Sequence, residues 1–303
     1  MSGVTVGGAV RAGREALAQA GVDTPRLDAE LLLASVLDCG RERLVIDRDR
    51  ALDPAAAARY DDLLARRTAR EPVAFILGHR YFRRLTLAVD RRVLIPRPET
   101  ELLVEVGLSL ASGASVIDVG TGSGAVALAL KDERPDLVVR GTDVSPDAVA
   151  VARENAARLG LDVSFFEADL LGPAVRGPAV CGPAVRDPAV CGPPVRDLAL
   201  LDPHGRSVDA VLANLPYVPL GAPLAPEISR YEPPGALFAG TDGLDLVRRL
   251  VSAVGEASVP LVALEIGPEQ AAEVSRLLHA AGFTGVEVRP DLAGLDRVVV
   301  GTA

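Results

Sequence analysis

The spacing of hydrophobic residues along the chain changes near residue 78. From residue 8 to about 70, large apolar residues recur three and four positions apart, which is the period of a helix buried on one side. Thr24-Pro25 and Asp53-Pro54 supply helix starts, because a capping side chain followed by proline suits a first turn. The segment therefore predicts a small helical bundle, whose apolar positions include Leu27, Leu31, Leu32 and Val36.

The next segment carries the alternation that is typical of strands. Phe82–Val89 and Arg92–Ile95, separated by Asp90-Arg91, predict a β-hairpin. Pro96-Arg97-Pro98 ends the hairpin, and we expect a helix to begin at Glu99–Glu101.

From Ser115 onward, short apolar runs alternate with segments of helical period. The expected strands are Ser115–Val119, Leu137–Thr142, Val163–Glu167, Val208–Ala213 and Val259–Glu265, with a closing hairpin of Val286–Arg289 and Arg297–Val300. The expected helices are Ala125–Lys131, Pro146–Leu159 and Glu269–Ala281. This alternation indicates an α/β fold with a mainly parallel, doubly wound sheet.

Residues 172–196 interrupt the alternation with five pentapeptides: GPAVR, GPAVC, GPAVR, DPAVC and GPPVR. A proline in every repeat opposes both helix and ladder formation, so we expect a flexible or polyproline-like surface loop. Cys181 and Cys191 lie in these repeats, but two thiols without further ligands do not make a zinc site. No metal is therefore expected.

Composition and charge narrow the class of protein. Of 303 residues, 49% are hydrophobic, which is enough for a sizeable core. The formal net charge of −9 argues against a nucleic-acid binder, which usually needs a basic surface. The sequence shows no apolar run long enough for a membrane span and no signal peptide. Its three cysteines form no disulfide framework, so the cytoplasm is the expected compartment.

Polar residues follow three successive predicted strands. Asp118–Gly124 reads DVGTGSG between a strand and a helix, where glycines let the backbone approach a ligand closely. Asp143 ends the next strand, where an acid can accept both hydroxyls of a ribose. Asp169-Leu170 ends the third, where the two side chains could frame an adenine. The set predicts a nucleoside ligand without a pyrophosphate, for which S-adenosyl-L-methionine is the common case; a glycine turn with two capping acids is the alternative.

A further tetrapeptide, Asn214-Leu215-Pro216-Tyr217, ends the predicted strand Val208–Ala213. An asparagine oxygen and a backbone carbonyl can accept the two hydrogens of a planar NH2 group, and a tyrosine ring can lie against its flat face. An ordinary proline-containing turn is the alternative.

The sequence resembles the release-factor glutamine methyltransferases (PrmC/HemK family). The resemblance covers nearly the whole chain outside 172–197, and its most specific element is Ile95–Glu101, which reads IPRPETE. The other matching segments are Asp28–Leu33, Glu71-Pro72, Ile76–Gly78, Asp118–Gly124, Asn214–Tyr217, Tyr231–Pro233, Gly240–Leu244, Asp291–Gly294 and Asp296-Arg297.

The resemblance implies a fold and a division of the chain. A helical N-terminal substrate-recognition domain would span 1–78 and a linking hairpin 79–98. A seven-stranded, Rossmann-like class I S-adenosylmethionine-dependent methyltransferase domain would span 99–303, with 172–197 as an insertion.

The resemblance also implies an activity. The protein would transfer a methyl group from S-adenosyl-L-methionine to the side-chain amide of the glutamine in the GGQ motif of class I peptide chain release factors. It would act in the cytoplasm near the ribosome, without a membrane and without a direct nucleic-acid substrate.

The implied site residues follow from the matched motifs. Catalysis would involve Asn214, Pro216 and Tyr217, and the glutamine would be held by Asn214, Leu215, Pro216 and Tyr217. The cofactor contacts would be Gly120, Thr121, Gly122, Ser123, Gly124, Asp143, Asp169, Leu170 and Asn214.

Two departures from the family pattern stand near this site. Leu215 occupies a position where the family usually has proline, although a residue before Pro216 is still biased toward extended backbone. The pentapeptide insertion lies between the third strand and the tetrapeptide; we expect it to loop outward.

Other polar residues allow two interpretations each. Arg97, Glu99 and Glu101 either contact the substrate or fix a corner between domains, and Glu232 is expected to order a loop over the pocket. His79, His204 and His279 show no metal or triad spacing. The arginines of the hairpin either protect an exposed edge strand or contact a release factor or nearby RNA; they are Arg80, Arg83, Arg84, Arg91 and Arg92.

Two other functions remain open from the sequence. Adenine and cytosine also present an exocyclic NH2 group, so an rRNA or DNA amino methyltransferase is the alternative enzyme. A catalytically impaired S-adenosylmethionine-binding homologue, disabled by Leu215 or by the insertion, is the other.

Overall fold

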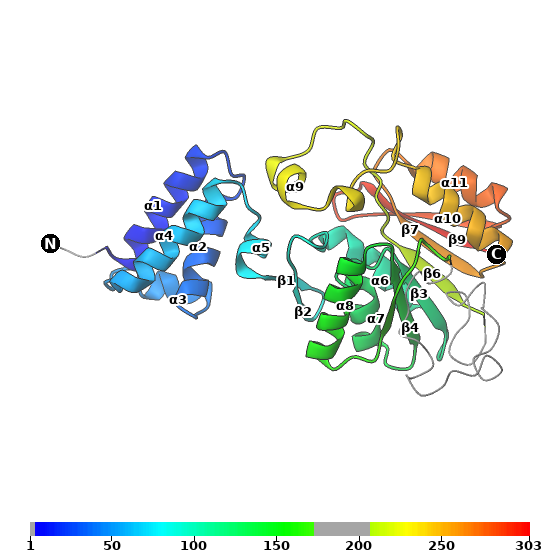
Figure 1. Cartoon of the computed structure of the whole chain (residues 1–303), viewed down its shortest axis with the longest axis horizontal. Coiled ribbons are helices and arrows are strands. Elements are labelled where there is room, and N and C mark those ends of the chain that lie inside the picture. Colours follow the sequence, from blue (N-terminus) through cyan, green and yellow to red (C-terminus); the bar gives the residue numbers. More distant parts are fainter. Residues whose placement is uncertain (1–3, 173–206) are drawn as a thin grey trace, which may run out of the picture. The chain divides into compact units, whose positions relative to one another are not determined.

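The computed structural model describes residues 4–172 and 207–303, and it divides into two compact units. The first unit comprises Met1–His79 together with Leu224–Glu232, and the second comprises Arg80–Pro223 and Pro233–Ala303. The pentapeptide repeats, with Cys181, Cys191 and His204, lie outside the described residues. Figure 1 shows the elements of each unit.

The first unit is a bundle of helices, as the sequence predicted. Its helices are α1 (Val6–Gln19), α2 (Pro25–Val36), α3 (Arg41–Ile46), α4 (Pro54–Thr68), α5 (Val73–Leu77) and α9 (Pro226–Tyr231). Asp53 caps α4 by accepting hydrogen bonds from the N–H groups of Ala55 and Ala56. Helices α2 and α4 begin at the predicted positions, although Thr24 makes no capping hydrogen bond with its side chain. The bundle closes over a core that includes Leu32, Leu33 and Tyr60.

Helix α9 comes from the later part of the chain yet belongs to the helical unit. Its Glu227 carboxylate accepts two hydrogen bonds from Arg70, at 2.6 and 2.7 Å, and pairs with Arg67 at 3.0 Å. Arg67 also pairs with Asp28 at 2.7 Å, and both of these side chains are buried. The Tyr231 hydroxyl donates to the carbonyl oxygen of Ala69. The sequence did not predict this helix.

The second unit begins with a hairpin whose predicted position was wrong. Its strands are β1 (His79–Phe82) and β2 (Leu85–Ala88), joined through Arg83-Arg84. Arg83 takes a left-handed backbone with φ of 51°, which turns the chain inside the segment that the alternation assigned to one strand. Residues 92–95 form no strand.

A seven-stranded sheet forms the centre of the second unit, in the order β5-β4-β3-β6-β7-β9-β8. The strands are β3 (Ser115–Val119), β4 (Val138–Asp143), β5 (Ser164–Glu167), β6 (Ala210–Ala213), β7 (Leu261–Glu265), β8 (Gly285–Pro290) and β9 (Asp296–Thr302). The first five are parallel, and β9 runs antiparallel to both β7 and β8. The predicted mainly parallel sheet and its closing hairpin are confirmed.

Helices cover both faces of this sheet (Figure 1). One face packs against α6 (Glu101–Leu108), α7 (Ala125–Glu133) and α8 (Pro146–Leu159). The other packs against α10 (Asp245–Glu256) and α11 (Ala271–Ala280). Alternate residues of one strand serve the two cores, as Val116 and Ile117 do in β3. The fold is therefore a doubly wound α/β sheet.

The topology fixes where a ligand is expected. The chain builds outward from β3 through β4 and β5, then returns to place β6 on the other side of β3. Ligands of doubly wound sheets bind at such a switch point, beyond the carboxyl ends of the strands. Among the described residues, no helix is long and apolar enough to cross a membrane.

Candidate active site

The glycine loop after β3 closes against the neighbouring strand through its backbone. The N–H groups of Gly120 and Thr121 both donate to the carbonyl oxygen of Thr142, at 2.8 and 2.9 Å. Gly120 and Gly124 have φ angles of 73° and 82°, a left-handed backbone that side chains rarely adopt. A Cβ on Gly124 would also lie 2.9 Å from Leu128. Glycine is therefore required here, and the loop leads directly into α7.

The buried side chain of Asp118 anchors this loop through hydrogen bonds. Its side chain is 2% exposed and accepts hydrogen bonds from the Thr121 hydroxyl at 2.6 Å and from the Ala127 N–H at 3.3 Å. Burial raises the pKa of the Asp118 carboxyl to about 7. The residue ties the loop to the first turn of α7.

Asp143 stands at the carboxyl end of β4, beside the loop. One carboxylate oxygen accepts from the Gly122 N–H and the other from the Ser145 N–H, each at 2.9 Å. Burial raises the pKa of the Asp143 carboxyl above its ordinary value. The Val144 N–H is a further backbone donor. A carboxylate has about four acceptor positions, so acceptor capacity remains for the hydroxyls of a ribose.

The corner after β5 is formed by Asp169 and Leu170. Leu170 has a left-handed φ of 55°, and its carbonyl accepts the Thr142 hydroxyl at 3.0 Å. The exposed Asp169 carboxylate pairs with Arg249 at 2.7 Å. Both residues line the same cavity as the glycine loop.

The Asn214–Tyr217 tetrapeptide starts directly after β6. The Asn214 side-chain amide donates from Nδ2 to the Thr100 hydroxyl at 3.0 Å. Leu215 is buried and packs against the glycine loop. Its Cδ2 atom lies so close to Gly120 that a Cβ atom built on this glycine would be only 3.2 Å away. The leucine side chain therefore makes apolar contact with the glycine loop.

Tyr217 ends the tetrapeptide beside the carboxyl end of β7. Its backbone carbonyl accepts a hydrogen bond from Gln270, and its ring packs near Gly267. Burial, together with the nearby Glu265 carboxyl, raises the pKa of the Tyr217 hydroxyl to about 12. The phenol is therefore neutral at physiological pH.

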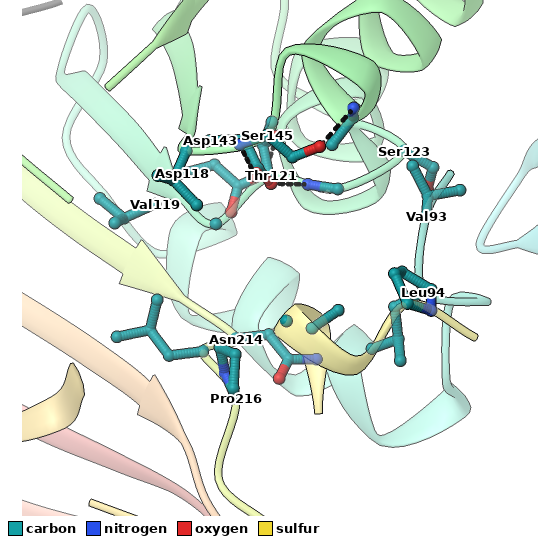
Figure 2. A pocket seen from close by; sticks show the side chains of 18 of the residues that line it. Val93, Leu94, Asp118, Val119, Thr121, Ser123, Asp143, Ser145, Asn214 and Pro216 are labelled. Atoms are coloured by element: carbon teal, nitrogen blue, oxygen red, sulfur yellow. Dashed lines mark hydrogen bonds between the residues drawn. The ribbon is translucent and has the colours of Figure 1, made fainter. Parts of the chain in front are cut away.

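These elements enclose a cavity of about 290 Å³ at the switch point. In Figure 2, Asp118, Thr121 and Asp143 lie on one side of the pocket, while Asn214 and Pro216 lie across from them. The cavity brings together most of the predicted site residues: Gly120, Thr121, Gly122, Ser123, Asp143, Asp169, Leu170, Asn214, Leu215 and Pro216. Gly124 and Tyr217 do not line it.

Several lining residues were not singled out in the sequence. Val93, Leu94 and Pro96 come from the segment after the hairpin, and Thr100 comes from the short 3-10 helix η1 (Pro98–Thr100). The other wall includes residues around η3 (Pro234–Ala236). The motif IPRPETE contains Thr100, but its pattern favoured a role only for its charged residues.

The geometry suits S-adenosyl-L-methionine. Left-handed glycines leave no side chain between the backbone and the cavity, Asp143 keeps acceptor positions for hydroxyls, and Leu170 and Leu215 supply apolar surface. The cavity volume is close to the lower end of ordinary small-molecule sites.

Several of the other charged residues predicted to have a role form ion pairs or hydrogen bonds within the second unit. Glu101 accepts a hydrogen bond from the Arg83 N–H at 3.3 Å, and the Arg83 guanidinium forms a two-point pair with Glu133. Arg92 pairs with Asp90 and Glu154. Arg83 and Arg92, two of the arginines that the sequence assigned to the hairpin, therefore make intramolecular ion pairs.

Glu232, His79 and His279 are not among the residues that line the cavity. Glu232 is buried at the end of α9, in the helical unit. His79 and His279 contact backbone carbonyl oxygens through Nδ1. Within residues 4–172 and 207–303, no group of three or more histidine, cysteine, aspartate or glutamate residues is placed to hold a metal ion.

The fold defines the class of protein. A sheet in this order, with helices on both faces and a glycine loop and an acid at the ends of β3 and β4, is that of a class I S-adenosylmethionine-dependent methyltransferase. The hMettl16 catalytic domain in complex with MAT2A 3′UTR hairpin 6 shares this fold, with a TM-score of 0.51 and 13% identity over 82% of each chain.

Sequence similarity defines the family. The PrmC N-terminal domain matches residues 8–78, and the methyltransferase small domain matches residues 98–197. The release factor glutamine methyltransferase of Rhodospirillum rubrum is 36% identical over 99% of this chain and 85% of its own length. That of Burkholderia pseudomallei is 42% identical over 89% of this chain and 90% of its own length. The chain belongs to the release factor glutamine methyltransferase family.

Proposed function

We propose that the protein transfers a methyl group from S-adenosyl-L-methionine to the side-chain amide nitrogen of the glutamine in the GGQ motif of class I peptide chain release factors. Near full-length similarity to release factor glutamine methyltransferases supports the substrate. The observation that carries the proposal is that Asn214 and Pro216 line the same cavity as the glycine loop and Asp143. The two residues proposed to bind the planar amide therefore face the expected position of the methyl donor.

The cofactor would be held by the loop Gly120–Gly124, with Asp143 accepting the ribose hydroxyls. Asp169 and Leu170 would border the adenine. S-adenosyl-L-methionine supplies an activated methyl group, so the protein does not need to form a covalent intermediate of its own.

The protein's task is to prepare the amide nitrogen, whose lone pair is delocalised into the carbonyl. The Asn214 oxygen Oδ1 and the backbone carbonyl of Pro216 would accept its two hydrogens. These hydrogen bonds localise the lone pair and strengthen as positive charge develops on nitrogen, which is the condition for lowering a barrier. In-line positioning adds up to about 7–11 kcal/mol in favourable cases.

The same proposal assigns a role to each part of the chain and a cellular location to the protein. Residues 1–78 would recognise the release factor, 79–98 would link, and 99–303 would carry the chemistry, with 172–197 as an insertion. With this substrate, the protein would act in the cytoplasm, near the ribosome. The net charge of −9 supports a protein partner rather than a nucleic-acid substrate.

Transfer of labelled methyl groups tests the proposal. The protein is incubated with labelled S-adenosyl-L-methionine and one of three acceptors: a release factor, the same factor with the GGQ glutamine replaced by alanine, or rRNA. We expect label on the intact factor alone. Label on rRNA would select an amino methyltransferase of nucleic acid, and cofactor binding without any label would indicate an impaired homologue.

A further inference from the structure

Three polar side chains from distant parts of the sequence meet at the carboxyl edge of the sheet. Thr100 ends η1, Asn214 follows β6, and Glu265 is the last residue of β7. Strands β6 and β7 are parallel neighbours in which Ala213 pairs with Leu264, so Asn214 and Glu265 are the next residues in register.

The three side chains are joined by hydrogen bonds of a defined direction. The Asn214 amide donates from Nδ2 to the Thr100 hydroxyl at 3.0 Å, and the same hydroxyl is hydrogen-bonded to the Glu265 carboxyl group. A threonine hydroxyl has one hydrogen, so Thr100 accepts from Asn214 and donates to Glu265. This order leaves the Asn214 oxygen Oδ1 as the end of the amide available to a ligand.

Glu265 is unusual for a carboxyl group at the edge of a core. Its side chain is 2% exposed, and among the described residues its oxygen Oε2 has no hydrogen-bond partner. A half-satisfied buried carboxyl costs stability, and an apolar residue would be cheaper in free energy. A role beyond packing accounts for its presence.

The groups around Glu265 determine the pKa of its carboxyl group. Burial and the neighbouring Glu99 carboxylate raise its pKa to about 7, whereas the Thr100 hydrogen bond and the guanidinium groups of Arg297 and Arg97 oppose the rise. The Tyr217 hydroxyl, whose pKa the Glu265 carboxyl helps to raise, is a further titratable neighbour and is neutral in this range.

We propose that Glu265 acts through Thr100 as a positioning residue for Asn214, holding Oδ1 toward the substrate amide. The proposal rests on the function proposed above for the same cavity. In its ionised form Glu265 polarises the chain of hydrogen bonds, because an anionic acceptor at one end strengthens each bond before it. The Asn214 oxygen then carries more negative charge and better stabilises the positive charge that develops on the substrate nitrogen.

Matched variants of Thr100 test the chain of hydrogen bonds. Thr100→Val keeps the shape but removes the hydroxyl, whereas Thr100→Ser keeps the hydroxyl. We expect Thr100→Val to lower kcat about 10- to 100-fold and Thr100→Ser to stay within about threefold of the wild type. S-adenosyl-L-methionine affinity, measured by calorimetry, should change little in both. Equal kcat values for the two variants would overturn the proposal.

The pH profile of kcat distinguishes positioning from packing. Only ionised Glu265 strengthens the chain, so wild-type kcat should fall as pH drops through about 7. Glu265→Gln keeps an acceptor for Thr100 but does not titrate, so its kcat should be lower and nearly constant across that range. A Glu265→Gln profile with the same inflection as the wild type would overturn the proposal.

A readout without substrate separates this proposal from the function on which it rests. In the wild type, the 15N resonance of the Asn214 side-chain amide should follow the titration of Glu265, and in Thr100→Val it should not. If the resonance follows the titration but no release factor is methylated, the proposed function fails and the hydrogen-bonded chain stands. A resonance that ignores the titration would overturn the chain itself.

Discussion

The Gln270 side chain donates a hydrogen bond from Nε2 to the backbone carbonyl of Tyr217 at 3.1 Å. The same NH2 group donates to the carbonyl of Asp242 at 3.1 Å, and the Gln270 oxygen accepts from the Gly267 N–H at 2.9 Å. One amide therefore joins three loops at the carboxyl edge of the sheet. Its contact with Tyr217 fixes the end of the tetrapeptide that carries Asn214.

Two variants distinguish the hydrogen bonds that the Gln270 side chain donates from the one that it accepts. Gln270→Ala removes all three hydrogen bonds, whereas Gln270→Glu keeps the acceptor for Gly267 and loses both donors. We expect both variants to raise KM for the release factor, since the tetrapeptide loses its anchor. The free energy of unfolding in urea should fall by about 1–3 kcal/mol in Gln270→Ala. Wild-type KM values in both would show that Tyr217 is fixed by other contacts.

Removing the Asn214 side chain tests its proposed part in catalysis. Asn214→Ala should lower kcat by at least about 100-fold, because one preorganised polar contact to the reacting group is worth about 2.7–4 kcal/mol. Cofactor affinity should change less, since the glycine loop and Asp143 remain. Stopped assays with a release factor measure kcat, and calorimetry measures affinity. Near-normal turnover would contradict the assignment.

The sequence predicted the positions of most helices and strands better than it predicted the turns that join them. Buried strands such as Ser115–Val119 were located because an apolar run between turn residues leaves few alternatives. The hairpin was misplaced because nothing in its alternation shows that Arg83 adopts a left-handed φ. Helix α10 was not predicted, although Val247, Leu250, Val251 and Val254 follow a helical period.

The cavity could be predicted from strand ends, but its hydrogen bonds could not. Asn214 and Asp143 were found because polar residues after buried strands are rare in a core. Glu265 also ends a predicted strand, so the same reasoning would have found it. Its connection to Asn214 through Thr100 joins residues far apart in sequence. The register of β6 and β7 brings Asn214 next to Glu265, and the 3-10 helix η1 adds Thr100.

Leu215 tests whether leucine in place of the family's usual proline matters. Leu215→Pro removes apolar contact with Gly120 while leaving the Asn214 oxygen and the Pro216 carbonyl in place. We expect kcat within about threefold of the wild type, because both proposed acceptors remain. Stability should fall by about 1–3 kcal/mol through lost packing.

Leu215→Ala is the matched control, because it loses the same packing without gaining the proline ring. Both variants should unfold at lower urea concentrations than the wild type. A gain in kcat above about tenfold in Leu215→Pro alone would show that leucine impairs the natural site.

Glu227 tests how α9 is held in the helical unit. Glu227→Ala leaves the buried Arg67 guanidinium with Asp28 and the Glu71 carbonyl oxygen, and it removes the two-point pair with Arg70. Because Asp28 still compensates the Arg67 charge, losing the charge-assisted hydrogen bonds of Glu227 should cost about 1.5–3 kcal/mol. Amide hydrogen exchange in α9 should therefore accelerate. Glu273→Ala is the control, because it removes only the exposed pair with Arg276, worth at most about 1 kcal/mol. Equal exchange in both variants would show that Glu227 does not hold the helix.

Asp118 makes stability depend on pH with a predictable sign. Burial raises its pKa from an ordinary value of 3.8 to about 7, so the folded state binds the proton more tightly. The contribution is fully present below about pH 4 and is lost as pH rises through about 7, amounting to about 4 kcal/mol. Asp118→Asn stays neutral, so its free energy of unfolding should depend less on pH over this window. Urea unfolding at several pH values measures the difference, which should grow in favour of the variant as pH rises; a constant difference would mean that Asp118 does not titrate there.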